Sequence, residues 1–257
     1  MGKASEQRYE RLLALLTQHG ELDVAALARA LDVSEATVRR DLGALEREGK
    51  LIRTLGGARL REESSLVVRT FREKHERMRA EKERIARAAA AYVEPGMVVA
   101  LDSGTTVWRV AAALRECGEL KVVTAALPAI EELGSVPSVE LFCVGGRLRP
   151  ENLDFVGPAA VAAFSELRAD VGFLGVDSLV AGRGVFSSDL ESAAITAAIG
   201  ECSRRRVVVM DHSKIDERGC FLGLPSEKID CLITDNGIEG RVREALRSEP
   251  YEVVFAE

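Results

Sequence analysis

The chain has 257 residues, enough for one or two domains, and carries a formal net charge of −6. Its apolar fraction of 47% is typical of a folded globular protein, which excludes a disordered chain. No apolar run approaches the roughly 20 residues of a membrane-spanning helix. The first residues lead directly into charged positions without a secretory signal, so we expect a cytoplasmic protein with no membrane partner.

The cysteines are odd in number, and no pair of them has the spacing of metal ligands. We interpret all five as reduced, mostly buried thiols of an intracellular protein. The sequence therefore predicts neither a metal site nor a cofactor. The five positions are Cys117, Cys143, Cys202, Cys220 and Cys231.

The acidic net charge argues against a nucleic-acid partner, but the charges are unevenly distributed. Residues 36–61 carry seven basic side chains and only three acidic ones. A local basic excess of this kind suits the phosphate backbone of DNA, and an acidic remainder discourages non-specific binding. Double-stranded DNA is therefore a candidate partner of this segment.

Apolar residues recur at helical spacing in the first part of the chain. They predict one helix that ends at Gly20, with an inner face of Tyr9, Leu12, Leu13 and Leu16. Asp23 is predicted to cap a short second helix, with an inner face of Val24, Leu27, Ala28 and Leu31. Asp32 and Val33 then form a tight connection, so the two short helices around it are expected to make a helix-turn-helix.

Ser34 is a good N-cap for the next helix, whose buried stripe is predicted at Val38, Leu42 and Leu45. The opposite face is small and basic, and comprises Ala36, Thr37, Arg39, Arg40, Gly43 and Arg47. Small residues permit close approach to a groove, and arginine binds phosphates or a guanine edge. Taken alone, an ordinary amphipathic helix with a solvated basic face explains this pattern equally well.

Residues 50–60 have the pattern of a β-hairpin with a bend at Gly56 and Gly57. A basic hairpin beside a recognition helix is typical of the wing of a winged helix, which contacts the DNA backbone. The predicted DNA-binding residues are Ser34, Ala36, Thr37, Arg39, Arg40, Lys50, Arg53, Gly56, Gly57 and Arg59.

These elements closely resemble the helix-turn-helix and wing signature of the DeoR family of bacterial transcriptional regulators, on the string VSEATVRRDLGALEREGKLIRTLGGA. We therefore expect a winged helix-turn-helix DNA-binding domain over residues 6–61. Within it, the helix-turn-helix is expected at about residues 24–47 and the wing at 50–60. Residues 62–79 are polar and charged and are predicted to form a linker.

From residue 80 to residue 257, short apolar runs alternate with helical patterns. Strands are predicted at residues 97–101, 120–124, 139–144, 171–176, 206–210, 231–234 and 251–255. This alternation predicts an α/β domain with a mainly parallel sheet and helices on both faces. Ligands of such sheets bind at the carboxyl ends of the strands, so the residues that follow each strand are the candidate site.

The first predicted strand leads into Asp102, Ser103, Gly104, Thr105 and Thr106, and then into a helix. Backbone N–H groups, the helix dipole and hydroxyl groups at such a turn can surround a phosphate. There is no Walker lysine, so the pattern does not indicate a nucleotide-binding loop. Plain capping of the helix by Ser103 or Thr105 is the alternative.

Glycines and charged residues also follow the other predicted strands. Glycines permit close backbone approach, cations bind phosphate or sugar oxygens, and carboxylates accept from hydroxyls. Each residue alone could equally be an ordinary turn or surface residue. These further candidates are Gly145, Gly146, Arg147, Gly175, Asp177, Glu191, Asp211 and Lys214.

The same stretches resemble the DeoR-family effector domain, on EKERIARAAAAYVEPG, LDSGTT, VVT, VGG, ADVGFLGVD and MDHSK. That domain is similar in fold to ribose-5-phosphate isomerase. The resemblance implies a phosphorylated sugar whose phosphate binds at residues 103–106. It also implies that Asp177, Glu191, Asp211 and Lys214 lie around the sugar.

Two functional hypotheses follow from these patterns. The first is a DNA-binding repressor of a carbohydrate catabolic operon, released from its operator by a phosphorylated sugar and without catalytic residues. Because one winged helix makes few base contacts, this hypothesis includes a homo-oligomer, a dimer or larger, on paired half-sites. The second is a sugar-phosphate isomerase or transferase with a DNA-targeting appendage. The residue types that suit acid–base chemistry are those of Asp102, Asp177, Glu191 and Lys214.

Overall fold

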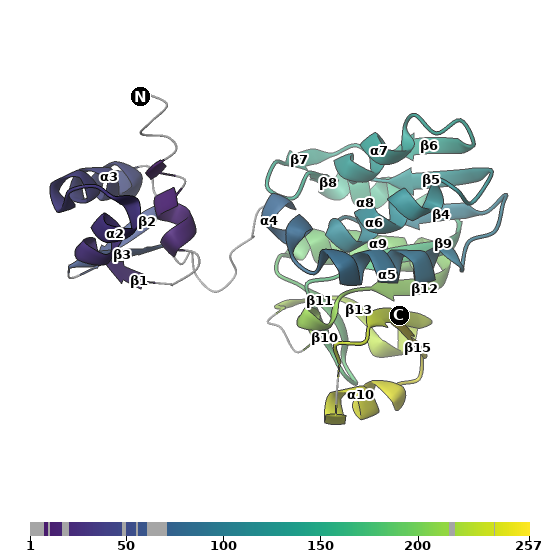
Figure 1. The fold of residues 1–257 in the computed structure, drawn as a ribbon. Helices are drawn as coiled ribbons and strands as arrows, with labels where there is room; N and C mark the ends of the chain where they lie inside the picture. Colours follow the sequence, from purple (N-terminus) through teal and green to yellow (C-terminus); the bar gives the residue numbers. More distant parts are fainter. Residues whose placement is uncertain are drawn as a thin grey trace. The chain divides into compact units, whose positions relative to one another are not determined.

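A computed structural model describes most of the chain, which divides into two compact units, Met1–Val67 and Val68–Glu257 (Figure 1). The described residues are 8–9, 11–16, 21–47, 50–54, 56–60, 71–215, 219–238 and 240–257. In these ranges no helix combines the length and apolar character needed to cross a membrane.

The first unit packs short helices against a three-stranded antiparallel sheet of order β1-β3-β2. Residues 8–9 and 11–16 are helical. The other elements are β1 (Glu21–Asp23), α2 (Val24–Leu31), α3 (Glu35–Arg47), β2 (Leu51–Thr54) and β3 (Gly57–Leu60). Leu27, Val38, Leu42 and Leu45 are buried at its centre, which confirms the predicted inner faces. Strand β1 was not predicted, and Gly20 lies outside the described residues.

Local capping fixes the two helices of the helix-turn-helix. Asp23 caps α2 as predicted, because its Oδ1 accepts from the backbone N–H of Ala26 at 2.6 Å. Asp32 takes the left-handed conformation (φ 54°) that ends α2. Ser34 Oγ accepts from the backbone N–H of Thr37 at 3.2 Å, as expected of the cap of α3.

The second unit is built on a seven-stranded parallel sheet of order β15-β14-β12-β9-β4-β5-β6. Its strands are β4 (Val98–Leu101), β5 (Leu120–Thr124), β6 (Val139–Cys143), β9 (Ala169–Gly175), β12 (Ser203–Val209), β14 (Cys231–Asp235) and β15 (Glu252–Ala256). Each of these strands overlaps one of the predicted apolar runs, with bounds that differ by up to three residues. The predicted mainly parallel α/β fold is therefore confirmed.

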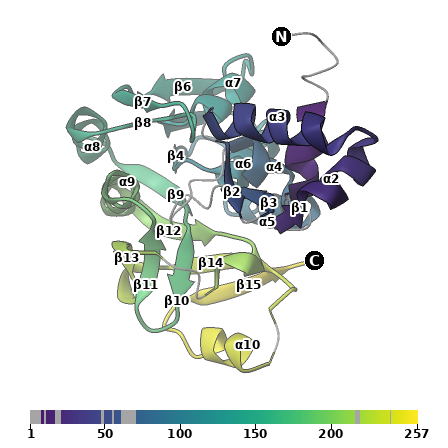
Figure 2. The same cartoon turned by 90° about the vertical axis from the view of Figure 1, so that its left-hand side faces the viewer.

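Helices cover both faces of this sheet (Figure 2). They are α4 (Phe71–Glu76), α5 (Arg79–Ala90), α6 (Thr105–Leu114), α7 (Leu127–Leu133), α8 (Pro158–Ser165), α9 (Leu190–Cys202) and α10 (Gly240–Arg247), with short turns η1 (His212–Lys214) and η2 (Ser226–Lys228). Alternation along β4 divides the core, because Val99 and Leu101 pack with α5, α6 and α7. Ala100 packs on the other face, with α8, α9 and α10.

Two small antiparallel sheets were not predicted. One is the hairpin of β7 (Arg147–Arg149) and β8 (Asp154–Val156), and the other joins β10 (Ser178–Val180), β11 (Gly184–Ser187) and β13 (Phe221–Pro225). Strands of three to five residues are too short to show a clear hydrophobic period. All five cysteines are free, but only Cys231 is buried, so the expectation of mostly buried thiols is wrong.

Candidate functional site

The outer face of α3 carries the small and basic residues predicted to contact DNA. Ala36, Arg39 and Arg40 are exposed, whereas Val38 and Leu42 are fully buried on the opposite face. Arg39 donates to Glu35 Oε2 at 2.7 Å across one helical turn, so part of its charge is already compensated. Arg40 forms no hydrogen bond or ion pair with any described residue. Arg40 is therefore free to bind a base edge or a phosphate.

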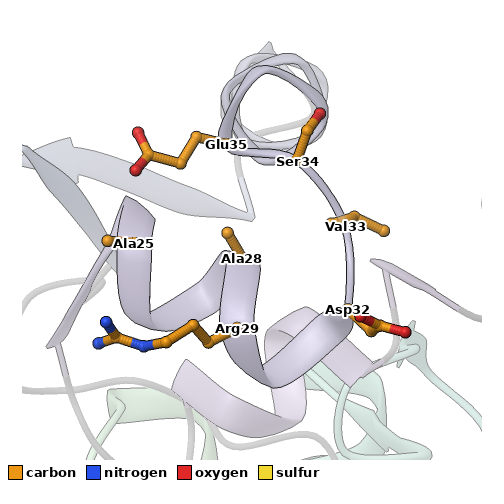
Figure 3. A pocket seen from close by; sticks show the side chains of 7 residues that line it. All are labelled: Ala25, Ala28, Arg29, Asp32, Val33, Ser34 and Glu35. Carbon is orange, nitrogen blue, oxygen red and sulfur yellow. The ribbon is translucent and has the colours of Figure 1, made fainter.

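A pocket lies between α2 and the start of α3 (Figure 3). It is lined by Ala25, Ala28, Arg29, Asp32, Val33, Ser34 and Glu35. Ala28 lies at its centre, and the side chains of Arg29 and Glu35 lie on the same side of it. Its lining thus combines small apolar residues with charged residues of both signs.

The hairpin of β2 and β3 supplies the remaining predicted DNA contacts. Lys50 and Arg53 are exposed, and the side chain of Arg59 lies outside the described part of the chain. Gly56 has φ +99°, a conformation that favours glycine at the turn. A Cβ on Gly57 would lie 2.2 Å from the carbonyl oxygen of Leu22, so Gly57 permits the pairing of β3 with β1.

The turn after β4, which is the predicted anion site, leads directly into α6. Gly104 has φ +108° and precedes α6, whose first backbone N–H groups have no partner within the helix. Thr106, in the first turn of α6, is 8% exposed. Its hydroxyl forms no hydrogen bond with any described residue. The turn thus presents backbone donors and one unused hydroxyl.

Asp102 is bonded within the protein at this turn. It is buried, and its carboxylate accepts from the N–H of Ser103 at 2.7 Å and from the hydroxyl of Thr196 at 2.8 Å. Gly175, at the end of β9, packs against the same turn, because a Cβ there would lie 2.3 Å from the Ser103 carbonyl oxygen. Both residues therefore position the turn.

Asp177, Lys74 and Lys214 form a group of charges beside this turn. Asp177 Oδ2 accepts from the N–H and the hydroxyl of Ser188 at 2.9 and 2.8 Å, and Oδ1 lies 3.8 Å from Lys74 Nζ. Burial alone would raise the pKa of Asp177, but Lys74 and Ser188 hold it below its usual value. Asp177 is therefore an ionised acceptor whose neighbours are cations.

Lys74 is a residue that sequence reasoning missed, because it lies in the polar segment interpreted as a linker. Its backbone carbonyl accepts from Lys82 Nζ at 2.9 Å and from the hydroxyl of Thr105 at 3.4 Å. Lys82 is itself buried, with Nζ 3.6 Å from Asp211 Oδ2. Burial lowers the pKa of both lysines.

The other predicted site residues have structural partners of their own. Arg147 and Glu191 are exposed and pair with each other. Asp211 caps η1, where it accepts from the N–H of Ser213 at 3.1 Å. A Cβ on Gly146 would lie 2.6 Å from the Val156 carbonyl oxygen. Gly145 is exposed and has open space around it, so the geometry gives it no defined role.

A buried arginine that was not predicted lies next to these residues. Arg149 donates to both oxygens of Asp154 at 2.8 and 2.6 Å and to Asp189 Oδ2 at 2.8 Å. Asp189 also caps α9 through the N–H of Ser192 at 2.9 Å. Because a buried cation is stable only when it is paired, this network fixes the β7–β8 hairpin to the start of α9.

Two family models match consecutive parts of the chain. Residues 8–64 match the DeoR-like helix-turn-helix domain, and residues 77–236 match the DeoR C terminal sensor domain. The chain belongs to the DeoR family. It is therefore a DNA-binding transcriptional regulator, and the alternative of a sugar-phosphate enzyme is not supported.

Named relatives of this DeoR-family chain align over nearly its whole length. A protein of Escherichia coli O157:H7, named for repression of the aga operon, is 31% identical over 98% of this chain and 94% of its own. The glycerol-3-phosphate regulon repressor of Escherichia coli (strain K12) is 31% identical over 89% and 90%. The transcriptional repressor AccR of Agrobacterium fabrum is 31% identical over 91% of each chain.

Solved structures similar to this DeoR-family chain include ribose 5-phosphate isomerase A from Methanocaldococcus jannaschii. The TM-score is 0.41 at 16% identity, with 55% of this chain and 56% of that chain covered. The enzyme from Plasmodium falciparum gives a TM-score of 0.39 at 13% identity, with 52% of each chain covered. Similarity at this level carries no argument about the activity of the DeoR-family chain.

The burial of Asp102 makes the folding stability of the second unit depend on pH. Burial raises the pKa of Asp102 to about 7 from an ordinary 3.8, although the hydrogen bonds from Ser103 and Thr196 act in the opposite direction. The carboxyl group of Asp102 therefore binds its proton more tightly in the folded state than in the unfolded state. This contribution to stability is complete below the unfolded pKa and is lost as the pH rises through the folded pKa.

Asp102→Asn removes this ionisation, so the free energy of unfolding of the wild type should fall relative to that of the variant between about pH 4 and pH 7. The expected slope is at most about 1.4 kcal/mol per pH unit. Urea unfolding of both proteins at several pH values from about 5 to 8 measures this difference. A difference that does not change with pH would show that Asp102 ionises in its ordinary range.

Proposed function

We propose that the protein represses a carbohydrate catabolic operon and leaves its operator when a phosphorylated sugar binds to the second unit. Relatives named for the aga operon and the glycerol-3-phosphate regulon support this assignment. The observation that carries the effector site is Thr106 at the N-terminus of α6, a residue that is 8% exposed and whose hydroxyl has no partner among the described residues. A phosphate there would accept from that hydroxyl and from the free backbone N–H groups.

In this proposal the phosphate lies against Ser103, Gly104, Thr105 and Thr106. Asp177 and Lys214 lie around the sugar, where a carboxylate accepts from hydroxyls and an ammonium donates. Asp102, Gly175 and Asp211 act by positioning the turns. The exposed pair of Arg147 and Glu191 would contact the effector only if their ion pair opened.

The proposed DNA-binding residues remain those of α3 and the wing. Residues 6–61 form the DNA-binding domain, residues 80–257 sense the effector, and residues 62–79 join them. Helix α4 lies within this joining segment, and its carbonyl contact with Thr105 belongs to the second unit. A homo-oligomer in the cytoplasm, a dimer or larger, would place two such domains on paired operator half-sites.

Operator binding by the purified full chain, titrated with phosphorylated sugars and their dephosphorylated forms, tests the function. The operator duplex is first recovered by selection with the protein from its own genomic DNA. Release by a phosphorylated sugar alone is the expected result. Turnover of the sugar phosphate, or equal release by both forms, would contradict the proposal.

Arg53→Ala should weaken binding by a similar factor on operator and random DNA, because an exposed wing arginine contacts phosphates rather than bases. The slope of binding affinity against salt concentration, on logarithmic axes, should fall by about one unit. Gel shifts at several salt concentrations measure both effects. Arg204→Ala, which removes an exposed arginine of the second unit, serves as the control. A loss confined to the operator would show that Arg53 reads a base.

A further inference from the structure

Helix α3 contains a glycine that the fold of the first unit does not require. Gly43 lies inside the helix, which runs from Glu35 to Arg47, and it does not have a positive φ. A Cβ built on it would meet no heavy atom of the described residues within 4 Å, its chain neighbours and the local helix backbone aside. Apart from proline, glycine is the poorest helix former. Neither the backbone conformation nor the packing of the described residues therefore explains this glycine.

Gly43 lies on the outer face of α3, opposite the fully buried Leu45. Arg40 comes three residues before it and Arg47 four residues after it, and both arginines are exposed. Residues at these spacings are neighbours on one side of a helix. The missing side chain therefore leaves an open place between two cations, on the face of α3 to which we assign the DNA contacts.

A bond to the backbone holds Arg47 beside this open place. Its Nε donates to the carbonyl oxygen of Gly43 at 3.1 Å, one turn back along the helix. Arg47 forms no ion pair with any residue that the structure describes, so none of them compensates its charge. Its terminal guanidinium nitrogens have no acceptor in the described ranges either, so their N–H groups remain available. Several N–H groups in a fixed fork match the oxygens of a phosphate.

We propose that the phosphate backbone of DNA lies against α3 at Gly43 and that Arg47 binds a phosphate there. This inference rests on the proposed DNA-binding face of α3 and adds two residues to its predicted contacts. A side chain at position 43 would hold the helix away from the phosphates, whereas glycine lets them approach. The attraction between Arg47 and a phosphate grows as the distance shortens and water leaves. The glycine therefore weakens the isolated helix and improves its fit to DNA.

The test compares two properties of the full chain that should change in opposite directions. Gly43→Ala should slow hydrogen exchange of the α3 amides by about fivefold, because alanine is the better helix former. The same change should weaken binding to operator and random DNA alike, by on the order of tenfold, because the added methyl separates the helix from the phosphates. Gly43→Leu should also slow exchange and should weaken binding further. Gel shifts at matched salt concentrations measure the affinities.

The role of Arg47 is tested by the salt dependence of binding. Arg47→Gln should weaken binding to both kinds of DNA and lower the salt slope by about one unit, and Arg47→Lys should restore that slope. Ala245→Leu adds bulk at an exposed position of α10 in the second unit and serves as the control. It should leave the affinity for DNA unchanged.

The outcomes separate this inference from the proposed function. If Gly43→Ala binds DNA as tightly as the wild type, the DNA backbone does not approach α3 at Gly43 and the inference is overturned. It is also overturned if Gly43→Ala speeds exchange, because the fold would then need the glycine. An unchanged salt slope in Arg47→Gln overturns the phosphate contact. The proposed function itself fails only if the wild type does not bind an operator or no phosphorylated sugar releases it.

Discussion

Replacing Thr106 with valine should reduce the affinity for a phosphorylated effector by on the order of tenfold to a hundredfold. Valine keeps the branched shape of threonine but lacks the hydroxyl, which forms no hydrogen bond with described residues in the free protein. The lost interaction is a hydrogen bond to a charged group, worth about 1.5–3 kcal/mol. The variant should therefore act as a repressor that no longer responds at ordinary effector concentrations.

Calorimetry with the phosphorylated and dephosphorylated forms of one sugar measures this loss. Thr234→Val is the matched control, because Thr234 in β14 likewise has a hydroxyl without a partner among the described residues, and that hydroxyl is buried. It should bind the effector as the wild type does. If Thr106→Val binds the phosphorylated form unchanged, the turn is only a helix start and the phosphate binds elsewhere.

Replacing Arg40 with alanine should weaken specific operator binding by about 1–3 kcal/mol if this side chain reads a base edge. Arg40 is exposed on α3, opposite the buried Val38 and Leu42, and no described residue compensates its charge. Binding to random DNA should change much less. This pattern differs from that of the wing arginine Arg53, whose loss should affect both kinds of DNA alike.

Gel shifts with operator and random duplexes at matched salt concentrations measure the difference. Arg39→Ala is an informative comparison, since Arg39 is on the same face but is paired with Glu35. Its loss should cost less than that of Arg40. Unchanged operator affinity in Arg40→Ala would mean that α3 presents a different face to DNA.

The main sheet was predictable because its central strands carry short buried apolar runs. Residues 98–101 and 207–209 are continuously apolar and rich in β-branched side chains, which is typical of a central parallel strand. The capping roles of Asp23 and Ser34 were predictable too, because they depend on neighbours within three residues. Local chemistry and burial together specify these elements.

The candidate site was less predictable because its geometry depends on distant partners. Asp102 appeared to face a ligand, yet it bonds Thr196, which lies 94 positions further along the chain. Arg149 and Asp189 are 40 positions apart. No local pattern shows that a carboxylate is already occupied. Lys74 was missed for a different reason: it lies on a short polar helix, whose sequence has no hydrophobic period that would distinguish it from a linker.

The carbonyl contact of Lys74 with Thr105 has a consequence for building hybrid regulators. A sensor unit fused to a foreign DNA-binding domain at residue 79 would lack α4, and with it the partner that Lys82 and Thr105 bond. Lys82 would then keep a buried ammonium with fewer acceptors. A fusion point ahead of Phe71 retains those acceptors. We therefore expect a hybrid regulator to respond to the effector only when α4 is included.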